Sequence, residues 1–168
     1  MNTGIRQELE SAFSDLTVVA ERDTELSVRV NKESVVSALS FLKGAGYEHL
    51  ALVSCVDWIE EGEFELVYIL SSYMPTDEAY TDREKRKLIV KARIPRDKPE
   101  FQTVTDLFPI AEPYERELHE LYGVRFEGHR RLLPLLLERE YEIPPFRKDF
   151  DTREYVEKTF GAIPAVEE

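Results

Sequence analysis

The residues best suited to chemistry stand together in one short stretch, residues 115–120, with the sequence ERELHE. Carboxylates and imidazoles bind metal ions and transfer protons. In a helix, Glu115 and His119 lie four residues apart on one face, and Glu117 and Glu120 lie three apart on another. A stand-alone metal-dependent enzyme that uses these four side chains is therefore one hypothesis.

The rest of the sequence does not complete such a site. A di-metal carboxylate bundle needs Glu-x-x-His pairs on two helices, and His49, His119 and His129 form no such pair. Gly44-Ala45-Gly46 ends a helical pattern, whereas a phosphate-binding loop would begin one. Cys55 is the single cysteine and lies in an apolar run, so it predicts an inert buried thiol and cannot supply the four thiolates of an iron–sulfur cluster. We expect no catalytic, cofactor-binding or metal-binding residue in this chain.

Composition narrows the class of protein. The 168 residues are 42% hydrophobic and 11% aromatic, which is enough for one globular core. The net charge of -12 argues against nucleic acid or an anionic membrane as the main partner. The longest strongly apolar run, residues 132–137, is much shorter than a bilayer span, so we expect a chain that is soluble by itself and does not span the membrane.

Apolar periodicity predicts the elements that would carry these residues. Helices are expected at 4–14 and from the N-cap Asn31 to a stop at Gly44 or Gly46. A short helix capped by Thr103 and a longer one from Pro113 to a stop at Gly123 follow. Strands are expected at 15–20, 25–30, 47–56, 64–70 and 88–94, with an exposed loop at 73–86 and a linker at 95–101. The fold class is α+β: a two-layer, mixed, mostly antiparallel sheet packed with helices, plus an extended irregular C-terminal segment.

The regular pattern ends after Gly123, which divides the chain into an α+β domain (1–123) and an extended partner-binding segment (124–168). Arginines at 130, 131 and 147 stand beside the leucines of 132–137 and beside Phe146. Arginine interleaved with leucine and aromatic residues is typical of protein interfaces. The alternative is that these arginines pair with Glu138, Glu140 and Glu142 of the same segment.

The motifs resemble a known family. ERELHELYGVRFEGH (residues 115–129), followed by RRLLPLLL and PPFRKDF (residues 144–150), resembles the C subunit of respiratory complex I, the NADH:quinone oxidoreductase. Upstream, VSCVDW, FELVYILSS, KLIVKARIP and VTDLFPIAEPYERE are similar to the same family, so the resemblance covers about residues 47–151. The sequence looks closest to the versions in archaeal energy-converting membrane-bound NiFe hydrogenases and related sulfur-reducing complexes. The run from Gly128 to Leu132 lacks the family's usual proline, and residues 140–143 replace its Trp-x-Gly. Both departures favour such a relative.

The resemblance implies a cofactor-free structural subunit in the hydrophilic redox arm of a membrane-bound, ion-translocating oxidoreductase. Its partners would be a large NiFe-hydrogenase-like subunit and a small iron–sulfur subunit, which would carry the NiFe and iron–sulfur clusters. The hetero-oligomer would hold this chain peripherally on the cytoplasmic side of the cell membrane. An NADH/quinone-type or sulfane-sulfur-reducing relative, and a soluble adaptor of an unrelated assembly, remain alternatives.

The residues expected at the partner interface combine family positions with the arginine-rich segment. They are Glu115, Arg116, Glu117, Gly123, His129, Arg130, Arg131, Arg147, Lys148 and Asp149. Reversal of Arg147 and Lys148 to glutamate is expected to disrupt assembly while leaving the isolated domain folded.

Overall fold

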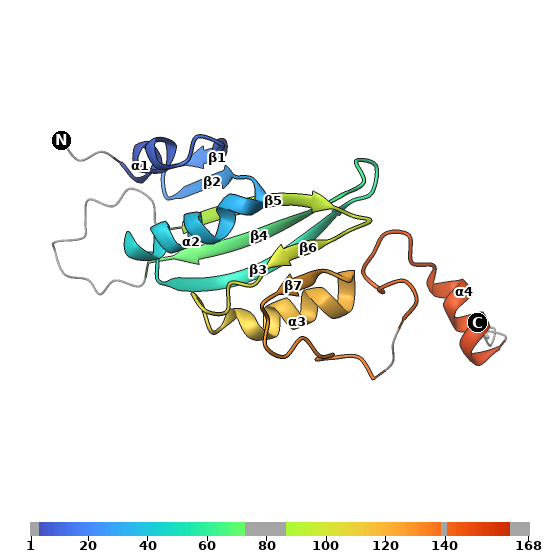
Figure 1. Cartoon of the computed structure of the whole chain (residues 1–168). Helices are drawn as coiled ribbons and strands as arrows, with labels where there is room; N and C mark the ends of the chain where they lie inside the picture. Colours follow the sequence, from blue (N-terminus) through green and yellow to red (C-terminus); the bar gives the residue numbers. More distant parts are fainter. Residues whose placement is uncertain (1–3, 73–86, 139–140, 162–168) are drawn as a thin grey trace.

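The protein is built on a five-stranded mixed sheet. This computed structural model describes residues 4–72, 87–138 and 141–161 (Figure 1). The strand order is β1-β2-β5-β4-β3, in which β2 and β5 run parallel and the other neighbours antiparallel. The strands are β1 (Thr17–Arg22), β2 (Glu25–Arg29), β3 (His49–Trp58), β4 (Glu63–Ser71) and β5 (Lys87–Pro95). The predicted α+β fold with a mostly antiparallel sheet is confirmed.

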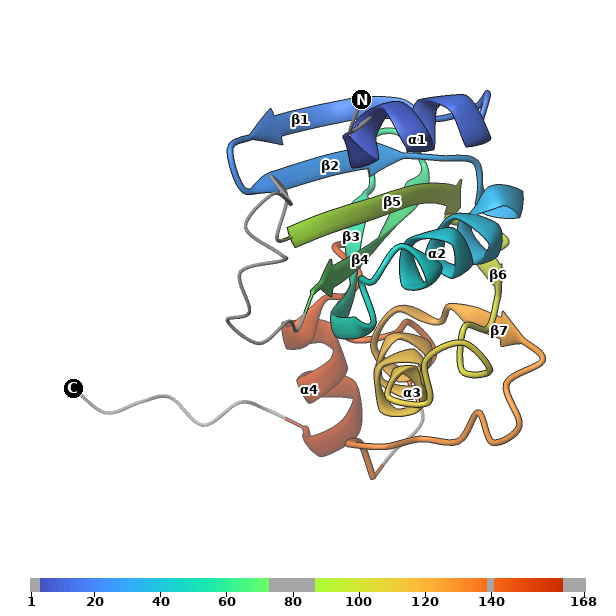
Figure 2. The same cartoon turned by 90° about the vertical axis from the view of Figure 1, so that its left-hand side faces the viewer.

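One face of this sheet forms the core. Alternation along β4 directs Phe64, Leu66, Tyr68 and Leu70 to one side, and each is fully buried. Helices α1 (Ile5–Ala12), α2 (Val35–Gly44) and α3 (Ala111–Tyr122) add their apolar stripes to the same cluster. Figures 1 and 2 show these helices along the sheet, with α3 next to β3. Each fully buried leucine or phenylalanine stabilises the fold by about 1.5–3 kcal/mol.

A second, two-stranded sheet joins the end of the predicted linker (95–101) to the start of the C-terminal segment. Strand β6 (Glu100–Gln102) pairs in parallel with β7 (Arg125–Glu127), and Phe101 faces Phe126. Both phenylalanines are buried, and so is Val124. The linker prediction for 95–101 is therefore wrong at its end, because a three-residue strand is too short to show periodicity.

Two predicted caps differ in detail. The side chain of Asn31 caps nothing; its backbone N–H donates to Asp15 Oδ2 at 2.8 Å, and a 3-10 turn (η1, Lys32–Ser34) precedes α2. Thr103 begins a set of turns in place of a short helix, and its Oγ1 accepts from the backbone N–H of Thr105 at 3.2 Å. Serine and threonine hydroxyls compete with helical hydrogen bonds in this way.

Helix α3 begins at Ala111, two residues before the predicted start at Pro113. Proline is tolerated there because the N–H groups of the whole first turn have no partner within a helix. The predicted end is confirmed: Gly123 has φ +77°, the left-handed conformation that glycine adopts without strain.

The C-terminal segment is less irregular than expected, because it contains β7 and a further helix, α4 (Thr152–Phe160). Asp151 caps α4 by accepting from the N–H groups of Arg153 and Glu154. The pattern DTRE resembles a capping box and could have revealed this helix from the sequence. Figure 1 shows α4 set apart from the sheet, and its Tyr155 stacks with Tyr141 and Phe150 of its own segment.

Two further expectations concern particular stretches. The predicted loop at 73–86 lies outside the described residues. Within the described ranges, no helix is both long and apolar enough to cross a bilayer.

Candidate partner interface

The first acidic residue of the ERELHE stretch lies inside the protein. Glu115 has no exposed surface, and its carboxylate accepts from the Thr103 hydroxyl at 2.5 Å and from the backbone N–H of Val104 at 2.8 Å. Burial raises the pKa of Glu115 to about 7, against the lowering effect of these two hydrogen bonds. Glu115 therefore ties α3 to the turns at 103–108 and does not face a partner directly.

Two other side chains of α3 hold the leucine loop, which we define as residues 132–137. The Glu120 carboxylate accepts from three consecutive backbone N–H groups, those of Leu135, Leu136 and Leu137, at 2.6–3.2 Å. Arg116 donates to the carbonyl oxygens of Leu133 and Pro134 at 2.9 and 2.8 Å. The guanidinium of Arg116 thus holds the carbonyl groups in the first half of the loop, and the carboxylate of Glu120 holds the N–H groups in the second half.

The loop is fixed with its apolar side chains outward. Leu133 is 50% exposed and Leu136 is 61% exposed. Phe146, which follows in the sequence, is 58% exposed. Exposed apolar side chains that are grouped on a fixed backbone indicate a surface for another protein.

Residues 144–150, here called the anchor stretch, fasten the segment to the end of α3. Arg147 donates through Nε to the carbonyl oxygen of Tyr122 at 2.7 Å, and its guanidinium lies 5.1 Å from the centre of the Phe64 ring. The close approach requires glycine at 123, because a Cβ there would lie 2.9 Å from Arg147 Nη2. Burial and the nearby Arg96 lower the pKa of Arg147.

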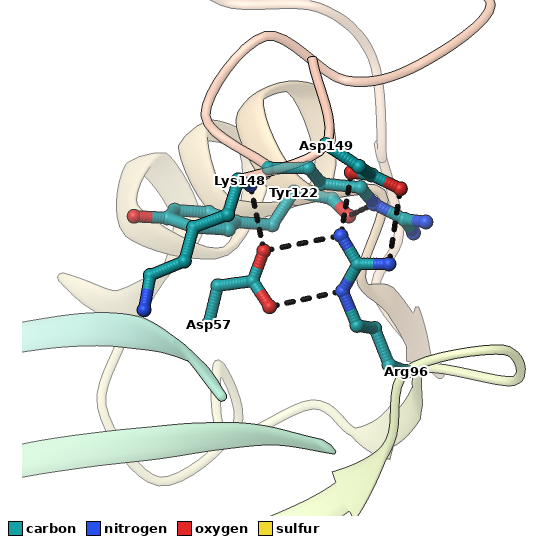
Figure 3. A network of polar contacts seen from close by, with 6 residues as sticks. Asp57, Arg96, Tyr122, Lys148 and Asp149 are labelled. Atoms are coloured by element: carbon teal, nitrogen blue, oxygen red, sulfur yellow. Dashed lines mark hydrogen bonds and ion pairs between the residues drawn. The ribbon is translucent and has the colours of Figure 1, made fainter. Parts of the chain in front are cut away.

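An ion-pair network completes the attachment (Figure 3). Arg96 lies between two carboxylates: Asp57, with contacts of 2.9 and 3.2 Å, and Asp149, with contacts of 2.5 and 3.1 Å. Asp57 also accepts from the backbone N–H of Lys148 at 2.8 Å. Asp57 is buried. The end of β3, the end of β5 and the anchor stretch therefore meet at one guanidinium.

The remaining predicted interface residues are scattered. Arg130 is 90% exposed and touches Asp106 at 3.5 Å, and Arg131 and the side chain of Lys148 are exposed. Nδ1 of His129 accepts from the backbone N–H of Arg131, and Glu117 is half-buried on α3. Among the ten predicted positions, Glu115, Arg116, Gly123, Arg147 and Asp149 make contacts within the chain, while Arg130, Arg131 and Lys148 have free surface. Their contact with a partner stays a prediction.

The four residues of the enzyme hypothesis do not converge on one point. Glu115 and Glu120 bind separate backbone groups, and His119 donates from Nδ1 to the carbonyl oxygen of Val124 at 2.9 Å. Among the described residues no group of three or more potential ligands could hold a metal ion. Burial raises the pKa of the Cys55 thiol to about 12, so it stays protonated and is a poor nucleophile. Stoichiometric metal in the purified protein would revive the enzyme hypothesis.

The sequence did not single out three residues that the structure places at the anchor: Asp57, Phe64 and Arg96. Asp57 and Phe64 lie in the family-like runs VSCVDW and FELVYILSS, and Arg96 directly follows KLIVKARIP. Asp57 was the available signal, because a carboxylate that ends an otherwise apolar strand needs a partner. The alternation of apolar and polar residues along a strand does not reveal that this partner is Arg96.

A small α+β domain that fixes its own C-terminal stretch and presents exposed leucines is built as one subunit of a larger assembly. The protein belongs to a family of complex I subunits: the family described as respiratory-chain NADH dehydrogenase, 30 Kd subunit, matches residues 28–156. The resemblance seen in the sequence is confirmed.

Relatives lie in several complexes of this kind. The C subunit of F(420)H(2) dehydrogenase from Methanosarcina mazei is 34% identical over 151 residues, which are 88% of this chain and 90% of that protein. The C subunit of NADH-quinone oxidoreductase from Erythrobacter litoralis is 33% identical over 95% of this chain, and the match spans 61% of that longer protein.

Solved structures share the fold. One protein in the structure of the membrane-bound sulfane sulfur reductase, an archaeal respiratory membrane complex, matches with a TM-score of 0.80 and 31% identity, over 98% of this chain and 94% of that one. A trypsin-resistant fragment of Nqo5 matches with a TM-score of 0.62 and 26% identity, over 76% of this chain and 96% of the fragment. The protein is thus a subunit of a multi-subunit oxidoreductase of the complex I family.

Proposed function

We propose that this protein is a cofactor-free structural subunit of the hydrophilic redox arm of a membrane-bound, ion-translocating oxidoreductase. It docks on the large, NiFe-hydrogenase-like subunit through its C-terminal segment, residues 124–168. The observation that carries the proposal is the fixed leucine loop, in which Leu133 and Leu136 are 50% and 61% exposed. Burial against a partner gives these side chains the apolar environment that the isolated protein does not provide.

Attachment at two points explains why the segment is suited to docking. A free segment loses conformational entropy when it orders on a partner, and a pre-ordered loop avoids most of that cost. Glu120 and Arg116 order the leucine loop, and Arg96 and Asp57 order the anchor stretch. Most of the binding surface is therefore present before the partner arrives.

The type of complex follows from two lines of support. The departures in residues 128–132 and 140–143 favour a hydrogenase-like or sulfur-reducing type over an NADH dehydrogenase type. Our first choice is the energy-converting hydrogenase type, with NiFe and iron–sulfur clusters in the large and small partner subunits. The coverage of 98% with the sulfane sulfur reductase protein favours the alternative, a sulfane-sulfur-reducing type. In both cases the protein is held peripherally, on the cytoplasmic side of the cell membrane, by its partners.

Metal analysis of the complex distinguishes the two types. The complex is purified through a tag on this subunit, and nickel and iron are quantified per copy. Nickel together with iron supports the hydrogenase type. Iron without nickel contradicts the hydrogenase type and leaves the sulfur-reducing and NADH/quinone-type alternatives.

Docking is tested with the double variant Leu133→Asp/Leu136→Asp. Because both side chains are exposed, the melting temperature of the isolated protein should stay within about 2 °C of the wild type. The amount of large subunit that co-purifies should fall about tenfold or more, since buried interface leucines become charged. The control is Val19→Asp, which changes a 43% exposed side chain on β1, at the opposite edge of the sheet from β3. Normal recovery of the large subunit with the double variant would exclude the loop as the docking surface.

A further inference from the structure

Phe146 is an exposed aromatic residue whose main chain and ring are both fixed to the body. Its backbone N–H donates to the carbonyl oxygen of Leu121 at 3.0 Å. Its ring lies edge-to-face on Tyr122, with 5.9 Å between the ring centres and 81° between the ring planes. Tyr122 in turn lies edge-to-face on Phe64, again at 5.9 Å. A row of three rings therefore runs from the core to the surface and ends in Phe146.

Fixation separates this ring from an ordinary surface residue. Along the row the exposure rises from Phe64, which has no exposed surface, through the half-buried Tyr122 to Phe146, which is 58% exposed. Single exposed apolar residues are common in soluble proteins and need no explanation. An exposed ring that is already held in one orientation, however, loses little further freedom when a partner covers it.

The turn that carries Phe146 is fixed as well. The backbone N–H of Arg147 donates to the carbonyl oxygen of Pro144 at 3.1 Å, which closes a four-residue turn with Pro145 and Phe146 in the middle. Proline suits the first of these middle positions, because its ring fixes φ near the value that the turn needs. Arg147 also binds the turn to the body, since its Nε donates to the carbonyl oxygen of Tyr122 at 2.7 Å. Phe146 is therefore exposed on a turn whose position is set by the body.

The helix that holds Phe146 also holds the leucine loop. Helix α3 binds the loop through the side chains of Arg116 and Glu120. It binds Phe146 through the carbonyl oxygen of Leu121 and the ring of Tyr122. A partner that covers the leucine loop thus meets the ring on the same rigid support, which is the reason to assign both to one partner.

We propose, given the proposed docking of residues 124–168 on the large subunit, that the ring of Phe146 enters an apolar pocket of that subunit. The ring is then the principal contact of the anchor stretch with its partner. Aromatic side chains that fill desolvated pockets contribute most to the affinity of protein interfaces. The walls of the pocket are aliphatic, aromatic or methionine side chains, because a charged group beside the ring would lose its water without gaining a partner.

A second copy of this protein fits the ring less well. One hollow in the described part of the surface is lined by charged residues, among them Asp15, Arg29, Glu33, Glu63 and Arg93. A ring that entered it would remove water from these charges. The family to which this chain belongs consists of subunits of larger complexes, so a different subunit is available as the partner.

The first experiment compares Phe146→Leu with Phe146→Gln. Leucine and glutamine are similar in size, and both variants lose the same ring contact with Tyr122. The melting temperatures of the two isolated proteins should therefore agree within about 2 °C. In the tagged complex, Phe146→Gln should lower the recovery of the large subunit about tenfold, because the amide enters an apolar pocket, and Phe146→Leu should keep most of it. Equal recovery with the two variants contradicts the proposal.

The matched control is the same pair of substitutions at Ile110. This side chain is 53% exposed, precedes α3 and lies outside the C-terminal segment. Ile110→Leu and Ile110→Gln should give equal recovery of the large subunit. A tenfold loss with Ile110→Gln would show a general effect of polarity and would overturn the assignment of the pocket to Phe146.

Photo-cross-linking identifies what covers the ring. A photoreactive phenylalanine derivative replaces Phe146 in the tagged full-length protein, and the complex is irradiated before purification. The expected product joins this protein to the large subunit. A product with a second copy, a cross-link within the chain, or the absence of a protein product overturns the proposal.

The variant Leu133→Asp/Leu136→Asp separates this proposal from the proposed function. Loss of the large subunit with that variant but not with Phe146→Gln would overturn the role of the ring and leave the proposed function intact. Normal recovery with both would overturn both proposals. Loss with Phe146→Gln alone would support the role of the ring and exclude the leucine loop as the docking surface.

Discussion

Glu115 illustrates how one charged residue can serve the fold while looking like a catalyst in the sequence. An ionised carboxylate in the core is unfavourable unless donors surround it. Two donors, the Thr103 hydroxyl and the Val104 N–H, offset only part of that cost, and burial raises the pKa to about 7. The helix therefore carries a group that is half-protonated near neutral pH.

The stability of the protein should depend on this proton. Between the ordinary pKa of 4.5 and the folded value of about 7, the folded state binds more protons than the unfolded state. Stability attributable to Glu115 is therefore highest at low pH and falls as the pH rises through this window. Glu115→Gln removes this pH dependence. Between pH 5.5 and pH 8 the wild type should therefore lose about 2 kcal/mol of unfolding free energy relative to the variant. Urea unfolding at the two pH values measures it.

Glu115→Ala is the companion variant. It leaves the Val104 N–H and the Thr103 hydroxyl without their acceptor and should cost about 1–3 kcal/mol. The cost should be larger at pH 5.5 than at pH 8, because this variant also lacks the titrating carboxyl. An unchanged pH dependence in Glu115→Gln would show that the carboxylate is ionised without cost in the fold.

Gly123→Ala is the second residue-scale prediction. The left-handed conformation alone costs about 1–2 kcal/mol with a Cβ. The added Cβ would also lie 2.9 Å from Arg147 Nη2 and 3.1 Å from Pro144 Cγ, so these two side chains of the anchor stretch must shift. Gly62→Ala is the matched control, because Gly62 has φ +68° but no atom near its Cβ position. Limited proteolysis should cut near residues 144–150 in Gly123→Ala only; equal resistance in both variants would contradict the predicted contact.

At the scale of elements, the ends of β3 and β5 and the anchor stretch depend on one another. Asp57→Asn removes the charge that faces Arg96 and places an NH₂ group among donors. Breaking such a buried pair typically costs about 3 kcal/mol. Hydrogen exchange should accelerate at the amides of Lys148 and Phe146, which donate to Asp57 and to Leu121, while the central strand β4 stays protected.

A surface ion pair provides the comparison. Glu100→Gln removes the partner of Lys98, whose side chain is 76% exposed, and should change stability by less than about 1 kcal/mol. If Asp57→Asn has an effect as small as Glu100→Gln, the network of Figure 3 does not hold the segment.

The side chain of Arg147 also joins two elements, β4 and the end of α3. The sequence suggested a charge reversal at Arg147 and Lys148 as a docking test, but Arg147 stacks on Phe64 and binds the end of α3. Its reversal would disturb the fold itself. Lys148, whose side chain is exposed, is the better position for a docking variant.

At the scale of the whole molecule, the boundary between the body and the docking segment can be tested by truncation. Val124 and Phe126 are 0% and 3% exposed and belong to the core cluster. A protein that ends at 123 loses both and should be destabilised by about 4 kcal/mol, a large fraction of a typical folding free energy of about 5–15 kcal/mol. A protein that ends at 130 keeps both and should unfold cooperatively in urea. Equal stability of the two truncations would support a body that ends at residue 123.

The sequence by itself determined the helices α1 to α3, the five strands of the main sheet and the family. Strict alternation in β4 and β5, the apolar stripe of α2 and the stop of α3 at Gly123 are local patterns, and each follows from the geometry of one element. The family-like motifs at 115–129 and 144–150 are equally local, which is why the resemblance could be read without coordinates.

Only the tertiary structure decided what the charged motifs do. Asp149 meets an arginine 53 residues earlier, and the Lys148 N–H meets an aspartate 91 residues earlier. The parallel pair β6–β7 joins segments that are each three residues long. Contacts between the ends of two elements produce no periodic pattern in the sequence of either element. They depend on how the long loops bring distant residues together. For that reason the sequence predicts a partner surface at Arg147 and Asp149 but not the contacts that both side chains make with the protein's own body.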